Sequence, residues 1–171
     1  MAIKNNEYEL DEIYELISEN KLVLPNFQRE FVWSKEQQAK LLASVMVDIP
    51  VGGLLILDGR ANDFSKRELC FPTEVVVQND CTYLLDGQQR MSALRTIFYD
   101  LYKDGDWVDV WSNMYGPLRN RWFISVEPEQ NENDVFGYQT LNFQGLSQYT
   151  DTDVYDFIHH RPIYKTKTEQ I

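Results

Sequence analysis

Five consecutive residues near the middle of the 171-residue chain suggest a specific chemistry. The segment Asp86-Gly87-Gln88-Gln89-Arg90 supplies a carboxylate, a glycine, two amides and a guanidinium in direct succession. A guanidinium neutralises the charge of a phosphate group, amides position its oxygens, and a carboxylate ligates Mg²⁺ or orients water. A phosphate group bound together with a metal ion would therefore use every one of these side chains.

The residues on either side predict the elements that position these groups. Residues 82–85 form a short apolar run of β-forming residues, which is typical of a buried strand. From Gln88 onward, Met91, Leu94 and Phe98 recur at helical spacing and define one apolar face. We therefore expect a strand, a tight glycine turn and a helix N-terminus, whose unpaired N–H groups and helix dipole favour an anion.

The same segment has a plainer interpretation. Asp-Gly is a common turn, and polar side chains at the start of a helix are often only caps. Two features favour a phosphate site. Arg90 lies in the first helical turn, where the helix dipole disfavours a cation unless an anion is close by. The adjacent Gln88 and Gln89 exceed what a cap requires, so we expect the side chain of Arg90 to face a ligand.

Composition restricts the class of protein. The 27 acidic and 16 basic residues give a formal net charge of -11, which opposes non-specific binding to nucleic acid but allows one local basic pocket. The polar N-terminus has no signal-peptide pattern, and no apolar run is long enough to span a membrane. We therefore expect a cytoplasmic protein without a membrane partner, in which Cys70 and Cys81 are reduced core residues.

Hydrophobic periodicity predicts most of the remaining elements. One helix is expected to end near Asn20, and a second to begin at Ser34, where Ser34 and Gln37 have the spacing of a capping box. Buried strands are expected at residues 22–24 and 54–57. Further strands are expected at residues 68–71, at 74–78 as a hairpin with the central strand, and at 122–126, and a short helix at 153–159.

A second polar cluster lies in the segment NFQREFVW, where Gln28 and Arg29 are flanked by large aromatic residues. We interpret Phe31 and Trp33 as core residues, because most large aromatic side chains of a small domain are buried. Arg29 alone fits a surface salt bridge as well as it fits a ligand site.

A pair of glycines, Gly52 and Gly53, stands between a predicted helix and a predicted strand. Adjacent glycines at such a position usually provide turn geometry. They also allow a ligand to approach the backbone closely, so both remain candidates for the border of a site.

The segments LPNFQREFVW and LLDGQQRMSAL together resemble the N-terminal domain of GmrSD-type restriction systems. Members of that family carry a P-x-FQR-x-[FY]-x-W segment, then a helix ending in a Pro-Gly turn, then a DGQQR segment that opens a helix. All three occur here in that order, at residues 25–33, 35–53 and 84–94. The resemblance covers about the first hundred residues. It implies an α/β (α+β) fold of the ParB/sulfiredoxin-like type, with a small mixed sheet flanked by helices.

The resemblance also implies a function. In that superfamily the equivalent strand-turn-helix holds nucleotide phosphates, often with a metal ion, and the family is linked to nucleotide hydrolysis coupled to restriction of modified phage DNA. We therefore predict a nucleoside triphosphate site with Mg²⁺, without a base preference. Asp86, Gln89 and Arg90 are the predicted catalytic residues, with Asp86 also the metal ligand, and the predicted nucleotide-binding residues are Gln28, Arg29, Gly87, Gln88, Gly52 and Gly53.

We expect residues 1–127 to form the nucleotide-binding domain and residues 128–171 to continue it or to begin a truncated C-terminal region. Many relatives continue into an HNH-type nuclease domain, whose metal-binding constellation is absent after Arg121. Modified DNA is therefore expected as a partner only through a missing C-terminal domain or a partner nuclease. Two alternatives remain: a non-catalytic module that senses modified DNA or a protein, and a ParB-like nuclease, which the acidic composition opposes.

Overall fold

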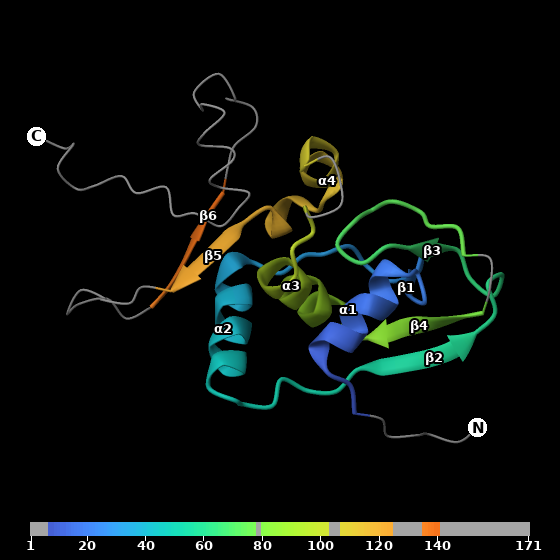
Figure 1. Ribbon diagram of the computed structural model, residues 1–171, viewed down its shortest axis with the longest axis horizontal. Helices are drawn as coiled ribbons and strands as arrows, with labels where there is room; N and C mark the ends of the chain where they lie inside the picture. The colour runs from blue at the N-terminus through green and yellow to red at the C-terminus, as the bar shows by residue number, and fades with distance from the viewer. Residues whose placement is uncertain (1–6, 78–79, 103–106, 125–134, 141–171) are drawn as a thin grey trace, which may run out of the picture.

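A four-stranded mixed sheet flanked by helices forms the centre of the computed structural model, as the sequence predicts (Figure 1). The structure describes residues 7–77, 80–102, 107–124 and 135–140. The elements in chain order are α1 (Leu10–Ser18), β1 (Leu22–Pro25), α2 (Lys35–Met46), β2 (Leu55–Gly59), β3 (Lys66–Arg67), β4 (Cys81–Asp86), α3 (Gln88–Phe98), α4 (Trp107–Asn113), the 3₁₀ helix η1 (Gly116–Leu118), β5 (Arg121–Ile124) and β6 (Phe136–Gln139).

Strand β4, which leads into the DGQQR turn, lies inside the sheet, whose order is β2-β4-β1-β3. It pairs parallel with β1 and antiparallel with β2, and its Tyr83 and Leu84 are completely buried. Tyr83 and Leu84 are successive strand residues and are buried in different hydrophobic clusters, so both faces of β4 are covered, which explains the apolar run in the sequence. The end of β4 is therefore a fixed point from which the turn at Asp86 and Gly87 starts.

Helix α3 follows β4 after the single residue Gly87, as predicted (Figure 1). Met91 and Leu94 lie in the main hydrophobic core, which also contains residues of α1, β1 and α2. Phe98 is an exception, because its side chain is 46% exposed where the last turn of α3 extends beyond the core. The predicted apolar face is therefore correct for the first two turns only.

The prediction of a hairpin leading into β4 is wrong. Residues 68–71 form a turn rather than a strand, and in the described part of residues 74–78 only Glu74 makes a β-bridge, with Arg67. Leu69, Cys70 and Phe71 are all buried in the core. Their apolar character therefore reflects core filling by a turn, whereas β4 finds its sheet partners in more distant parts of the chain.

Strand β2 forms close to its predicted place, but it is not buried. It lies at the edge of the sheet, and its Leu55 is 55% exposed. Strand β5 confirms the strand expected near residue 122, and it pairs antiparallel with β6. The helix expected at residues 153–159 lies outside the described residues.

The capping box expected at the start of α2 is confirmed. The hydroxyl of Ser34 accepts a hydrogen bond from the N–H of Gln37, whose amide oxygen accepts the N–H of Ser34 in return, so α2 begins with the expected capping box. Cys70 and Cys81 are buried and free of disulfides, and burial raises the pKa of the Cys70 thiol to about 12. None of the helices in the described ranges is long and apolar enough to cross a membrane.

The interior position of β4 leads to a first prediction. Leu84→Ala is expected to lower the free energy of unfolding by about 2–5 kcal/mol, because it leaves a cavity under the sheet. Leu55→Ala, the same change on the exposed edge strand, should cost less than about 1 kcal/mol. Urea unfolding of both variants measures the difference, and equal losses would contradict the strand order.

Candidate functional site

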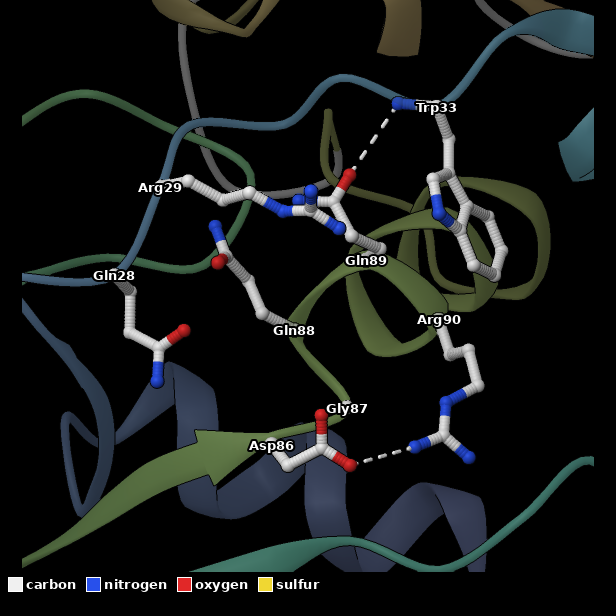
Figure 2. A pocket seen from close by; sticks show the side chains of 8 residues that line it. All are labelled: Gln28, Arg29, Trp33, Asp86, Gly87, Gln88, Gln89 and Arg90. Atoms are coloured by element: carbon white, nitrogen blue, oxygen red, sulfur yellow. Dashed lines mark hydrogen bonds and ion pairs between the residues drawn. The ribbon is translucent and has the colours of Figure 1, made fainter.

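A pocket of about 160 Å³ opens where β4 ends and α3 begins (Figure 2). Its second wall is the loop between β1 and α2, which carries the FQR segment. The two segments singled out in the sequence therefore meet at one site. The residues that line the pocket are Gln28, Arg29, Trp33, Asp86, Gly87, Gln88, Gln89 and Arg90.

The N-terminus of α3 forms the base of the pocket. Its hydrogen-bond ladder starts with the N–H of Met91, which donates to the carbonyl of Gly87 at 2.9 Å. The N–H groups of residues 88–90 therefore have no intrahelical acceptor. Gly87 has a left-handed φ of 99°, and a Cβ there would collide with the side chain of Leu54. Only glycine allows the strand to turn into the helix so abruptly.

The side chain of Gln88 is the most unusual group in the pocket. It is 4% exposed, and its amide nitrogen Nε2 is buried without a hydrogen-bond partner. In Figure 2 its amide extends from the start of α3 to a position between the side chains of Gln28 and Arg29. A buried donor without an acceptor costs about 1–3 kcal/mol, so an acceptor supplied by a ligand would remove a local penalty.

Gln89 joins the two walls of the pocket. Its amide oxygen accepts the backbone N–H groups of Val32 at 2.9 Å and Trp33 at 3.3 Å, and its amide nitrogen donates to the carbonyl of Glu30 at 3.0 Å. One side chain of α3 thus holds three positions of the opposite loop. This contact gives Gln89 a positioning role, whereas its predicted catalytic role stays a prediction.

The loop is also held at Gln28 and Arg29. The amide nitrogen of Gln28 donates to the carbonyl of Leu85 at 2.6 Å, which ties the loop to the end of β4. Its own carbonyl accepts from the guanidinium of Arg67, a buried residue of β3 that also bonds the carbonyl of Arg29. Arg67 was missed in the sequence, because no local pattern marks a contact that spans 39 positions.

The side chain of Arg29 has a different environment. The residue is exposed, and its guanidinium has no hydrogen bond or ion pair with the residues that the structure describes. Figure 2 shows it reaching from the loop across the pocket toward α3. A salt bridge was an equally good interpretation of the sequence, but no such pair forms within the described ranges. Its position leaves Arg29 available to an anion.

Arg90 does not simply face the pocket, as the sequence suggested. Its guanidinium donates to the carbonyl of Val51 at 2.5 Å and to that of Gly53 at 2.8 Å, and it lies 3.3 Å from a carboxylate oxygen of Asp86. The cation that the helix dipole disfavours is therefore balanced by two carbonyls and a carboxylate. Arg90 lines the pocket and also fixes the loop after α2, so its predicted catalytic role stays a prediction.

The chain matches the family described as "GmrSD restriction endonuclease, N-terminal domain" over residues 12–170. The chain belongs to this family. The match extends well beyond the segments that carry the motifs, and it confirms the resemblance drawn from them. The description of the family names the N-terminal domain of a restriction endonuclease.

A more distant similarity concerns a longer protein. The chain is 26% identical over 110 residues to the uncharacterized protein MJ0686 of Methanocaldococcus jannaschii. The aligned region covers 60% of this chain but only 18% of that protein. The chain therefore spans less than a fifth of the length of this relative.

Asp86 is the carboxylate among the residues lining the pocket that could ligate a metal ion. Among the described residues, no group of three or more His, Cys, Asp or Glu side chains could hold one. Mg²⁺ is commonly bound through one or two carboxylates, with substrate phosphates and water completing the shell. Asp86 fits that role, because it lines the pocket and its side chain is 72% exposed. A metal here would be held jointly by Asp86 and a bound phosphate group.

The two predicted border glycines differ sharply. Gly52 has a left-handed φ of 90°, and a Cβ there would overlap the guanidinium of Arg90, whereas a Cβ at Gly53 would meet nothing within 4 Å. Neither glycine lines the pocket, so they border it only through Arg90. Gly53 contributes its carbonyl, which any residue could provide.

This difference gives a matched pair of variants. Gly52→Ala should lower the free energy of unfolding by at least about 1–2 kcal/mol, the cost of a left-handed conformation for an L-residue. Gly53→Ala should stay within about 0.5 kcal/mol of wild type, as is usual for a substitution that meets no other atoms. Thermal unfolding provides the measurement, and a Gly53 variant as unstable as the Gly52 variant would contradict the placement of Arg90.

Proposed function

We propose that this GmrSD N-terminal domain binds a nucleoside triphosphate with Mg²⁺ and hydrolyses it, with the phosphates in the pocket at the DGQQR turn. The observation that carries the proposal is the set of unused donors on one spot. The buried Nε2 of Gln88 extends from the first turn of α3 toward the guanidinium of Arg29, which has no partner among the described residues, and the N–H groups of residues 88–90 have no intrahelical acceptor. Phosphate oxygens are acceptors that would satisfy all of them together.

Charge supports the same ligand. The pocket has two guanidinium groups and one carboxylate, within a chain whose formal net charge is -11. A local positive site in an acidic protein attracts a small multivalent anion, while the overall charge repels a long polyanion such as DNA. The pocket therefore suits phosphate groups of a nucleotide better than a nucleic-acid backbone.

The residues divide the work of hydrolysis. Water attacks the terminal phosphorus, the bond to the bridging oxygen breaks, and a nucleoside diphosphate and inorganic phosphate leave. The N–H groups of residues 88–90 and the amide of Gln88 bind phosphate oxygens, and Arg29 neutralises charge on the transferred group. Asp86 holds Mg²⁺ or orients the attacking water, and Arg90 keeps that carboxylate in place. Mg²⁺, when bound, neutralises the charge that develops on the phosphate oxygens.

A role in restriction follows from the family. We propose that cleavage of modified DNA belongs to another domain or to a partner nuclease, and that nucleotide turnover in this domain is coupled to it. The acidic composition supports this division, because tight DNA binding depends on many basic contacts to phosphates. A non-catalytic sensing module is the alternative. Measurements of nucleotide binding and of phosphate release separate it from a hydrolase.

Ligand-induced stabilisation tests binding. A nucleoside triphosphate with Mg²⁺ at ~100 times its dissociation constant should add about 2.7 kcal/mol to the free energy of unfolding. Arg29→Ala should lose most of this gain without changing unliganded stability, because its guanidinium makes no bond within the described residues. Arg60→Ala removes the same charge from an exposed position outside the pocket and should keep the gain.

Arg29 is a cleaner probe than Arg90, whose loss would also release the loop carbonyls of Val51 and Gly53. If wild type gains no stability from any common nucleoside triphosphate with Mg²⁺, the proposed phosphate site is wrong. Equal losses in the Arg29 and Arg60 variants would instead indicate a general charge effect.

Phosphate release tests hydrolysis. Asp86→Asn keeps the size of the side chain but removes its charge, and it should lower the rate by roughly 10²-fold or more at saturating nucleotide. Binding should weaken by a smaller factor, since the donors of α3 remain. Rates of wild type and variant that coincide at matched saturation would remove Asp86 from the mechanism, and binding without turnover in wild type would favour the sensing module.

A further inference from the structure

Trp33 differs from every other residue that lines the pocket. The other seven are polar, charged or glycine, so Trp33 provides the only large apolar surface in the lining. The sequence interpretation assigned this side chain to the core, and that is half correct. The ring is partly buried and packs against the main core cluster, yet it also forms one wall of the pocket.

The main chain at Trp33 is held from both sides. Its N–H donates to the amide oxygen of Gln89 at 3.3 Å, and its carbonyl accepts from the amide of the completely buried Gln38 at 3.4 Å. The next residue, Ser34, caps α2. The indole therefore stands on a rigid support, as a preorganised ligand contact requires.

The indole ring of Trp33 makes no polar or aromatic interaction with the other described residues. Its indole N–H makes no hydrogen bond there, and the ring makes no aromatic contact with the other described side chains. Figure 2 shows it standing beside Gln89 and Arg90, with the nitrogen-bearing edge directed toward the side of Gln89. A surface of this kind, apolar on its faces and polar at one edge, suits a heterocycle or a sugar.

The size of the pocket indicates what Trp33 contacts. Sites that enclose a drug-sized ligand measure about 300–1,000 Å³. The space of about 160 Å³ here is enough for phosphate groups but not for a complete nucleotide. The nucleoside must therefore extend beyond the polar donors. The face of an aromatic ring offers no hydrogen-bond donor to a phosphate group. Stacking on a base, in contrast, strengthens binding by about five- to 150-fold.

We propose that Trp33 is a specificity-determining residue of this site: its ring contacts the nucleoside, so the site selects nucleoside triphosphates over inorganic polyphosphates. This inference rests on the proposed phosphate site. It adds a residue that contacts the nucleoside, which the phosphate-binding groups do not contact. Stacking is tolerant of base identity, so the ring accounts for recognition of a nucleoside rather than of one particular base.

Calorimetric titration with each common nucleoside triphosphate and with inorganic tripolyphosphate, all with Mg²⁺, tests the inference. Wild type should bind its best nucleotide at least about tenfold more tightly than tripolyphosphate. Trp33→Leu keeps apolar packing against the core but removes the aromatic ring. It should reduce nucleotide affinity to the level of tripolyphosphate while leaving tripolyphosphate affinity unchanged, and Trp33→Phe should retain part of the preference.

Tryptophan fluorescence gives a second readout that does not depend on the leucine variant folding. The chain has four tryptophans, and Trp122 in β5 lies outside the pocket. Nucleotide should change the emission of wild type and of Trp122→Phe, but not that of Trp33→Phe.

The outcomes separate the two proposals. If wild type binds neither ligand, the phosphate site itself fails. If wild type binds both ligands with equal affinity, the phosphate site stands and the role of Trp33 is overturned. The same holds if Trp33→Leu still prefers nucleotide over tripolyphosphate. A leucine variant that binds neither ligand leaves the decision to Trp33→Phe, where an unchanged preference together with an unchanged fluorescence response contradicts the inference.

Discussion

The amide of Gln89 is the contact on which the site depends. It bonds the backbone at Glu30, Val32 and Trp33, and so joins the loop before α2 to the N-terminus of α3. Neither segment alone encloses a ligand, since one is an irregular loop and the other a helix end. The buried amide supplies hydrogen-bond partners to three backbone groups that would otherwise need water. The amide of Gln89 is bonded to protein on both its oxygen and its nitrogen, so it joins the two walls of the pocket.

Two arginines extend the same principle. Arg67 bonds the carbonyls of Gln28 and Arg29, and Arg90 bonds those of Val51 and Gly53. Each holds a loop that has no regular hydrogen bonding of its own, which gives the site a rigid frame without additional strands. Among the pocket-lining side chains, Gln88 Nε2, the guanidinium of Arg29 and the indole N–H of Trp33 have no partner in the described ranges. Arg67 and Arg90 are positioning residues because their guanidinium groups bond loop carbonyls, whereas Gln88 Nε2 and Arg29 face the pocket as candidate ligand groups.

The proposed phosphate site and the proposed role of Trp33 complement each other physically. Donors on α3 and on Arg29 attract charge, which is the same for every triphosphate, so they cannot identify what carries the phosphates. An aromatic wall reads the remaining part of the ligand through shape and stacking. Both features come from the DGQQR and FQR segments, and this explains why the two segments occur together in one small domain.

Local sequence determined the core of this site. An apolar run, an Asp-Gly turn and a helical period are consecutive features, so β4, Gly87 and α3 could be predicted from short-range physics alone. The same reasoning failed at residues 69–71, where an apolar run fills the core as a turn, because burial does not distinguish a strand from a buried loop. Only the tertiary structure decided that Gln89 and Arg90 hold loops, that Arg67 belongs to the site, and that Trp33 faces the pocket. Each of these depends on a contact between residues far apart in the chain, and no local pattern encodes which distant backbone group a long polar side chain will reach.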